Sequence, residues 1–164
     1  MKVIGFAGWS GSGKTMLVER VIGLLEARGL VVSLIKHAHH DAEVDYPGKD
    51  TFRLRHAGCR EVLLTTMNRW ALMHELRGRA EMTLDDALKQ LSPCDLVLVE
   101  GFKHAPIPKI EVWRAEVEKP LLFPDDPHII AVASDSALET KLPQLNINDP
   151  AAVAEFIVAV NGLG

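Results

Sequence analysis

Short apolar runs alternate along the chain with segments whose apolar residues recur at helical spacing. Runs typical of buried strands cover residues 2–7, 30–36, 61–66, 95–100 and 128–133. Helical spacing follows the first run, and it returns near residue 83 and after Asp149-Pro150. Strands that alternate with helices predict a three-layer α/β fold around a mostly parallel sheet.

Three further elements complete the predicted fold. The run 61–66 is followed closely by residues 70–74, and this pattern predicts an added antiparallel hairpin. Residues 109–114 alternate in polarity, so we expect a strand near an edge of the sheet. Asp50 is expected to cap a short helix that Gly58 ends.

The turn between the first strand and the first helix carries the clearest chemical signal. Gly8–Thr15 reads GWSGSGKT and matches the phosphate-loop pattern GxxxxGK[ST]. Its glycines let backbone N–H groups surround phosphate oxygens at a helix N-terminus. Lys14 would reach the β and γ phosphates, and the Thr15 hydroxyl would ligate Mg²⁺. The sequence thus predicts a P-loop NTPase fold whose phosphate-binding residues are Ser10, Gly11, Ser12, Gly13, Lys14 and Thr15.

Polar residues also stand at the carboxyl ends of other predicted strands, where ligands bind in open parallel sheets. Asp95 begins the strand 95–100 and Glu100 ends it, about 17 Å away at about 3.3 Å per residue. Glu100 can therefore reach the phosphate edge, where it would serve with Lys14 in catalysis by holding Mg²⁺ or orienting water. An ion pair between Glu100 and Lys14 in the empty protein is the alternative.

The segment 37–50 is polar, lacks periodicity and contains a turn at Pro47-Gly48. Its histidine spacing matches no familiar zinc site, which disfavours a transition metal. A solvated loop and a switch-like loop that orders around the γ-phosphate and Mg²⁺ both remain open. The candidate residues of the switch-like loop are His37, His39, His40, Asp41, Asp45 and Asp50.

Asp135 is a candidate for binding the base. P-loop GTPases place an aspartate after a late strand, where it accepts hydrogen bonds from guanine. Residues 132–135 keep this aspartate but lack the Asn and Lys of the usual NKxD pattern. A role in a helix cap or a turn therefore remains an equal alternative.

Composition and charge limit the classes of function. The chain has 164 residues and a net charge of −4, which provides no basic footprint for nucleic acid. Its apolar runs are too short to span a membrane, and its first residues do not resemble a signal peptide. Cys59 and Cys94 are isolated and are expected to be reduced thiols. We therefore expect one cytoplasmic domain over residues 1–164 with no nucleic-acid or membrane partner.

Several longer passages are more specific than the phosphate loop, which many families share. They read IKHAHHD at 35–41, DYPGKD at 45–50, RWAL at 69–72 and LVEGFKH at 98–104. Together with the phosphate loop they resemble the MobB family of molybdopterin-guanine dinucleotide biosynthesis adapter proteins. The resemblance extends over nearly the whole chain.

The resemblance implies a homodimer that binds GTP with Mg²⁺, hydrolyses GTP weakly and assists the molybdopterin guanylyltransferase. That enzyme attaches GMP to molybdopterin to form the guanine dinucleotide cofactor. Related GTPases often carry an extra lysine early in the phosphate loop, where this chain has Trp9-Ser10. The alternative is a small-metabolite kinase of the uridine-kinase type, which would need an arginine-bearing lid. Arg77 and Arg79 are the nearby basic pair and no long insertion surrounds them, so the adapter is favoured.

Overall fold

The computed structural model describes residues 1–38 and 44–164. By its internal contacts the chain forms two compact units. One unit combines Met1–His37 with Leu84–Gly164, and the other is Ala38–Thr83. No helix in the described residues is both long and apolar enough to cross a membrane.

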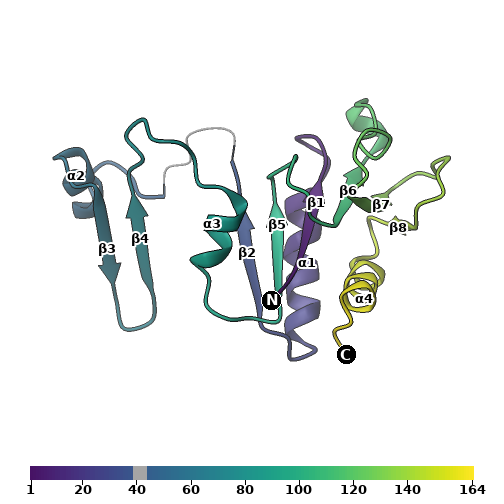
Figure 1. The fold of residues 1–164 in the computed structure, drawn as a ribbon, viewed down its shortest axis with the longest axis horizontal. Helices are drawn as coiled ribbons and strands as arrows, with labels where there is room; N and C mark the ends of the chain where they lie inside the picture. Colours follow the sequence, from purple (N-terminus) through teal and green to yellow (C-terminus); the bar gives the residue numbers. More distant parts are fainter. Residues whose placement is uncertain (39–43) are drawn as a thin grey trace. The chain divides into compact units, whose positions relative to one another are not determined.

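The first unit is built on a parallel sheet (Figure 1). Among the described residues its six strands follow the order β2-β5-β1-β6-β7-β8, and every neighbouring pair is parallel. The strands are β1 Lys2–Ala7, β2 Val32–Lys36, β5 Leu96–Glu100, β6 Lys109–Trp113, β7 Ile129–Ser134 and β8 Gln144–Asn146. Because the strands are parallel, their carboxyl ends open at one edge of the sheet.

Helices cover both faces of this sheet. The helices are α1 Lys14–Glu26, α3 Leu84–Lys89 and α4 Pro150–Asn161, with a 3₁₀ turn at Ala115–Val117. Leu96 and Leu98 of β5 pack into the core with residues of α1 and α4. Val97 and Val99, which alternate with these leucines, pack with Leu84 of α3 on the opposite face. The predicted three-layer α/β fold is confirmed, and burial on both faces explains why β5 shows no alternation.

The second unit contains α2 Asp50–His56, β3 Glu61–Thr65 and β4 Trp70–His74. The two strands pair in an antiparallel hairpin with Leu63 opposite Leu72, which confirms the predicted hairpin. The expected helix cap at Asp50 is wrong, because Lys49 occupies the N-cap position and makes no side-chain capping bond. Asp50 is instead the first helical residue, and its carboxylate lies 3.8 Å from Arg53. An acid in the first turn still favours the helix dipole.

Strand β6 was expected near an edge, and this expectation is wrong. It lies inside the sheet between β1 and β7. The alternation that suggested an edge comes from Lys109 and Glu111, which are buried. Their charged groups form hydrogen bonds with backbone groups of neighbouring loops instead of facing water. The sequence reading also missed β8, whose three residues are too few to show a period.

Candidate nucleotide site

The phosphate loop connects β1 to α1 and adopts a conformation that needs glycine. Gly11 and Gly13 have φ values of 84° and 86°, in the left-handed region that favours glycine. A Cβ on Gly8 would lie 2.3 Å from the carbonyl oxygen of Val112, so this loop packs directly against β6. Helix α1 begins after Gly13 without a side-chain cap, which leaves its first N–H groups directed at the loop. Such a helix start favours a phosphate.

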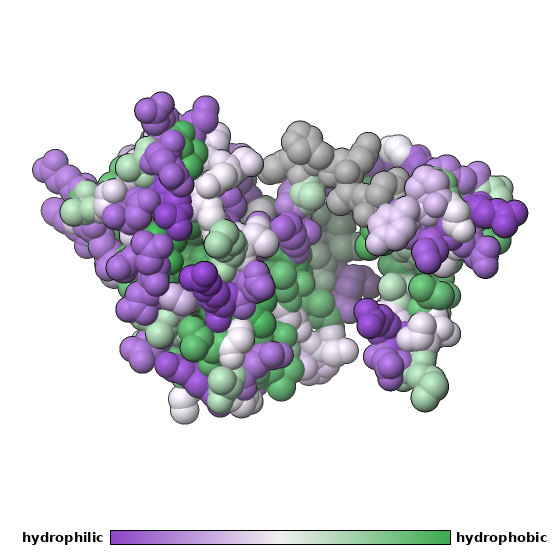
Figure 2. Space-filling view, turned by 180° about the vertical axis from the view of Figure 1, so that it is seen from behind, coloured by the Kyte–Doolittle hydropathy of each residue, from purple (hydrophilic) through white to green (hydrophobic). Residues whose placement is uncertain are grey.

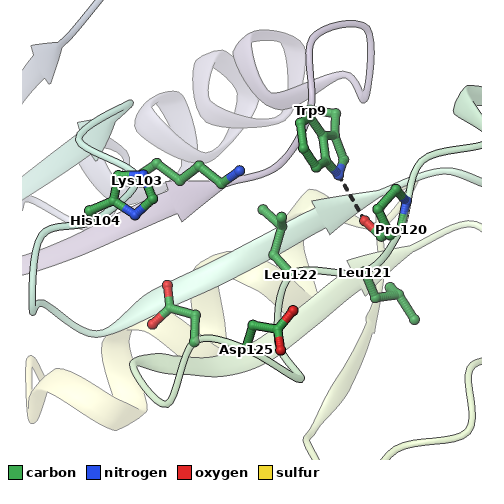
Figure 3. Close-up of a pocket in the computed structure, with 8 residues that line it drawn as sticks. Trp9, Lys103, His104, Pro120, Leu121, Leu122 and Asp125 are labelled. Atoms are coloured by element: carbon green, nitrogen blue, oxygen red, sulfur yellow. Dashed lines mark hydrogen bonds between the residues drawn. The ribbon is translucent and has the colours of Figure 1, made fainter.

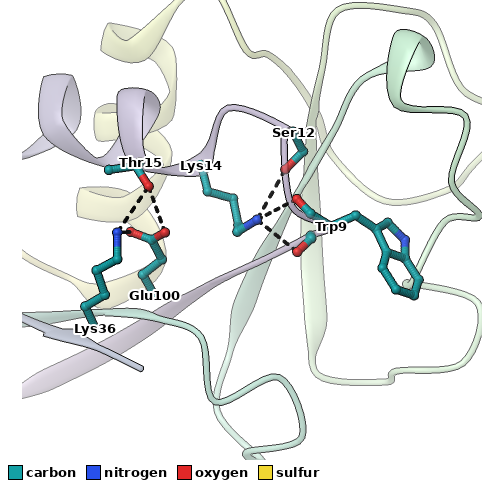
Figure 4. Close-up of polar contacts among 7 residues, drawn as sticks. Trp9, Ser12, Lys14, Thr15, Lys36 and Glu100 are labelled. Atoms are coloured by element: carbon teal, nitrogen blue, oxygen red, sulfur yellow. Dashed lines mark hydrogen bonds and ion pairs between the residues drawn. The ribbon is translucent and has the colours of Figure 1, made fainter. Parts of the chain in front are cut away.

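Lys14 folds back over the phosphate loop (Figure 4). Its Nζ donates to the carbonyl oxygens of Gly8 at 2.9 Å and Trp9 at 2.7 Å. The pKa of Lys14 lies below its ordinary value, mainly because the side chain is partly buried. The carboxylate of Glu100 opposes this shift, and the Lys36 ammonium adds to it. The ammonium is thus held by neutral carbonyl groups, and an anionic phosphate would be a stronger partner.

Thr15, Glu100 and Lys36 form the second part of the site (Figure 4). The Thr15 hydroxyl donates to Glu100 Oε1 at 2.8 Å. Lys36 Nζ lies 3.5 Å from Glu100 Oε2 and 3.4 Å from the Thr15 oxygen. A hydroxyl beside a buried carboxylate supplies the oxygen ligands that Mg²⁺ prefers, so these residues fit the metal.

The acids at the two ends of β5 have different surroundings, as the sequence predicted. Asp95 precedes the strand and its carboxylate accepts a hydrogen bond from the N–H of Val31 at 2.8 Å. Glu100 lies at the phosphate edge. Its carboxylate forms an ion pair with Lys36, whereas the alternative raised from the sequence was an ion pair with Lys14. Lys36 was not assigned a role from sequence, although the parallel register that places it opposite Glu100 is the signal that could have found it.

His37 follows β2 at the same edge. Its N–H donates to the carbonyl oxygen of Glu100 at 2.8 Å, and its ring lies 4.6 Å from that of Phe102. A Cβ on Gly101, whose φ is 95°, would lie 2.6 Å from the His37 carbonyl oxygen. The two strand ends therefore lie too close together for any residue but glycine at this position. The candidate switch residues His39, His40 and Asp41 lie outside the described residues.

The remaining acids of the candidate switch lie in the second unit. Asp45 forms an ion pair with Arg55, which also contacts Glu75 at 2.6 Å. The hydrogen bond from Arg55 is the main cause that lowers the pKa of Asp45. Asp50 faces Arg53. Over the described ranges 1–38 and 44–164, no group of three or more His, Cys, Asp or Glu side chains is arranged to hold a metal ion.

Asp135 follows β7 and is held by polar neighbours. Its carboxylate lies 3.3 Å from Arg114 Nη1 and accepts from the N–H of Ala115 at 3.3 Å. Burial raises the pKa of Asp135, but the hydrogen bonds from Ala115 and Ser136 and the charge of Arg114 outweigh this and lower it. Arg114 also lines a hollow of about 100 Å³ beside the first turn of α1. The base-binding role of Asp135 stays a prediction.

Comparison with known proteins identifies relatives over most of the chain. The family model MobB, described as "Molybdopterin guanine dinucleotide synthesis protein B", matches residues 3–135. A relative from Escherichia coli (strain K12), named molybdopterin-guanine dinucleotide biosynthesis adapter protein, is 44% identical over 159 residues, which are 95% of this chain and 91% of the relative. A protein of the same name from Haemophilus influenzae is 45% identical over 94% of this chain and 86% of its own.

Solved structures share the fold. A MobB homologue from Bacillus stearothermophilus superposes with a TM-score of 0.74 at 23% identity, over the full length of both chains. Bacillus subtilis MobB superposes with a TM-score of 0.73 at 25% identity, over 97% of each chain. The resemblance read from the sequence is confirmed by these matches. The chain belongs to the MobB family.

Proposed function

We propose that this protein is a GTP-binding, weakly GTP-hydrolysing adapter in molybdenum cofactor biosynthesis. It assists the attachment of GMP to molybdopterin, which forms the guanine dinucleotide cofactor. The names of its relatives support the pathway. The observation that carries the nucleotide site is the contact between Thr15 and Glu100 beside the uncapped start of α1. This arrangement offers a phosphate-binding helix end and a pair of Mg²⁺ ligands together.

Each group in the site has a separate task in this proposal. The backbone N–H groups of the phosphate loop bind the phosphate oxygens, and Lys14 places its charge beside the β and γ phosphates. Thr15 and Glu100 hold Mg²⁺, which would neutralise charge on the phosphates when bound. Trp9-Ser10 occupies the region where related GTPases carry an early lysine, and the missing positive charge supports the proposal that hydrolysis is weak.

We further propose that the hairpin of the second unit forms the homodimer interface. Residues directly opposite each other in the hairpin share a face, and one such face carries Leu63, Trp70 and Leu72. These side chains are 59%, 68% and 50% exposed. Figure 2 shows hydrophobic residues reaching the surface over these strands, on the right of the view. An isolated two-stranded sheet is marginally stable, so a second copy would bury an apolar face that otherwise contacts water.

The partner that this proposal requires is the molybdopterin guanylyltransferase, in the cytoplasm. Cys59 and Cys94 are both free thiols, in keeping with a reducing compartment. A kinase function gains little support, because a lid needs arginines that are available to phosphate. Arg77 is used within the second unit, where its guanidinium donates to the carbonyl oxygen of Cys59 at 3.0 Å.

The deciding experiment is a titration of the purified protein with GTP and with ATP, each with and without Mg²⁺. Binding would be followed by calorimetry and phosphate release by a coupled assay. The adapter predicts tighter binding of GTP than of ATP and slow phosphate release that needs no acceptor. ATP consumption that depends on an added metabolite would overturn the proposal in favour of the kinase.

A further inference from the structure

A pocket of about 450 Å³ lies next to the phosphate loop (Figure 3). The indole of Trp9 forms one wall, and in Figure 4 this ring points away from the pair of Thr15 and Glu100. Pockets that bind small molecules commonly measure about 300–1,000 Å³, so the volume suits a ligand of one or two rings. The lining residues that matter here are Trp9, Lys103, Pro120, Leu121, Leu122 and Asp125.

One wall is an irregular segment, residues 118–123, that is nevertheless held firmly in place. Two indoles donate to carbonyl oxygens of this segment, Trp9 to Pro120 at 2.7 Å and Trp113 to Lys119 at 2.8 Å. The fully buried carboxylate of Glu111 accepts two of its N–H groups, at 2.7 and 2.9 Å. A buried carboxylate is costly unless it is hydrogen-bonded, and here its bonds hold the wall of a pocket. The wall is thus formed before any ligand arrives.

A second buried charge joins the two sides of the pocket. Lys109 is 1% exposed, and its Nζ donates to the carbonyl oxygens of Lys103 at 2.9 Å and Ala105 at 3.0 Å. The same ammonium lies 2.6 Å from the carboxylate of Asp126. The Lys109 ammonium therefore connects the loop after β5 to the loop before β7. Lys109 and Glu111 are two buried charged residues at alternate positions of β6. Buried charges are unusual in a core, and both of these support the pocket.

The lining has the chemistry of a site for a flat ring. The Trp9 indole offers an aromatic face, and Lys103 Nζ lies over it at 4.1 Å from the ring centroid. Leu121 and Leu122 supply apolar contacts. The exposed carboxylate of Asp125 lies across the pocket from Trp9, with Leu122 between them in Figure 3. An ionised carboxylate only accepts hydrogen bonds, and its two oxygens match a ring edge that offers two adjacent N–H donors.

We propose that this pocket binds a fused heterocycle with a 2-amino-4-oxopyrimidine edge, which pterins and guanine share. The ring stacks on Trp9, its N–H and amino groups donate to Asp125, and Lys103 swings to a carbonyl or phosphate group of the ligand. This inference rests on the proposed function, because it gives the adapter a second ring site beside its nucleotide. The Trp9 backbone belongs to the phosphate loop, so both ligands would contact one residue.

The test measures fluorescence anisotropy of pterin (2-amino-4-oxopteridine) with the 164-residue protein, in the absence of nucleotide and with one equivalent of GTP and Mg²⁺. Lumazine (2,4-dioxopteridine), which lacks the amino group, is the matched ligand control. Guanosine is added as a competitor to distinguish the two sources of the edge. We expect pterin or guanosine to bind the GTP-loaded protein and lumazine to bind at least about tenfold more weakly. Equal binding of pterin and lumazine, displacement of pterin by a single equivalent of GTP that fills the phosphate loop, or binding of neither ring would overturn the proposal.

Asp125→Asn tests the residue that is proposed to accept hydrogen bonds from the ring edge. Asp85 is an exposed acid on α3, and Asp85→Asn is the control. Asp125→Asn should weaken pterin binding about tenfold or more and leave the affinity for GTP unchanged, because Asp125 is outside the phosphate loop. Unchanged pterin affinity in Asp125→Asn overturns the assignment of this residue. If the protein binds pterin through Asp125 but has no affinity for GTP, the pocket is supported and the proposed function is refuted. The pocket and the proposed function can therefore fail separately.

Discussion

The hydroxyl of Thr15 donates a hydrogen bond to the carboxylate of Glu100 at 2.8 Å, although the two residues lie 85 positions apart in the chain. Strands β1 and β5 pair in parallel, with Phe6 opposite Glu100, so the phosphate loop and the end of β5 open at the same edge. Glu100 is 8% exposed and therefore partly withdrawn from water. A carboxylate in this position interacts more strongly with a bound cation than an exposed one would.

Glu100→Gln should depress Mg²⁺-dependent binding and hydrolysis of GTP. The substitution removes one charge at nearly constant volume, and a charge-assisted contact contributes about 1.5–3 kcal/mol, or about tenfold or more in affinity. GTP titrations with Mg²⁺ and with a chelator would measure the effect. Asp95→Asn, at the other end of the same strand, is the control and should change neither quantity. A larger effect from Asp95→Asn would contradict the assignment of Glu100.

Lys14→Ala should abolish measurable GTP binding and leave the fold intact. The Lys14 ammonium donates to neutral carbonyl groups of its own loop, and Glu100 keeps its ion pair with Lys36 when Lys14 is removed, so the fold should tolerate the substitution. The lost phosphate contact corresponds to about 1.5–3 kcal/mol. Calorimetry would report the affinity, and circular dichroism the fold. Lys2→Ala, at the start of β1, should bind GTP normally; equal affinity in the two variants would refute the phosphate site.

The sequence predicted that the phosphate loop and Glu100 lie at the same edge of the sheet, because the ends of strands can be located from the hydrophobic pattern. The pattern placed the phosphate loop after β1 and Glu100 at the end of β5, and parallel pairing brings the two together. Lys36 was not assigned because its role depends on β2 lying beside β5, and strand order is set by packing rather than by local pattern. Lys109 and Glu111 misled the reading of β6, since buried charges mimic the alternation of an exposed edge.

Asp135→Asn tests base recognition. If Asp135 binds guanine, the variant should bind GTP more weakly and lose preference between GTP and xanthosine triphosphate, because the amide replaces one acceptor oxygen with a donor. Competition titrations with the two nucleotides would measure this ratio. Asp135 also pairs with Arg114 and accepts from Ala115, so a purely structural role predicts lower thermal stability with unchanged discrimination. That second result would leave base recognition to other residues.

Leu72→Lys tests the proposed dimer. Leu72 is 50% exposed on the hairpin face that carries Leu63 and Trp70. Burying a leucine contributes about 1.5–3 kcal/mol, and an unpaired charge in its place opposes association, so the dimer should weaken about tenfold or more. Light scattering at micromolar concentration would show a shift towards monomer. Gln90→Lys adds the same charge on an exposed position after α3 and should stay dimeric; a monomeric wild type would contradict the interface.

The ion pair of Asp45 with Arg55 predicts a specific dependence of stability on pH. The guanidinium holds the pKa of Asp45 below its ordinary value of 3.8. An acid whose pKa falls on folding stabilises the fold above its unfolded pKa, and this contribution disappears as the pH drops through the folded value. The melting temperature of the wild type should therefore exceed that of Asp45→Asn from pH 7 down to about pH 4, and the difference should shrink as the pH falls below 3.8.

Asp50→Asn is the control for this experiment. The Asp50 side chain is 92% exposed and lies 3.8 Å from Arg53, so its ion pair is screened by water and should change the melting temperature little. A difference for Asp45→Asn that persists unchanged at pH 3, or grows there, would contradict the role of the ionised carboxylate. The same two variants also address the candidate switch. A loss of stability in Asp45→Asn without loss of GTP affinity would mean that this acid serves the second unit, because a Mg²⁺ ligand could not be neutralised without weakening GTP binding.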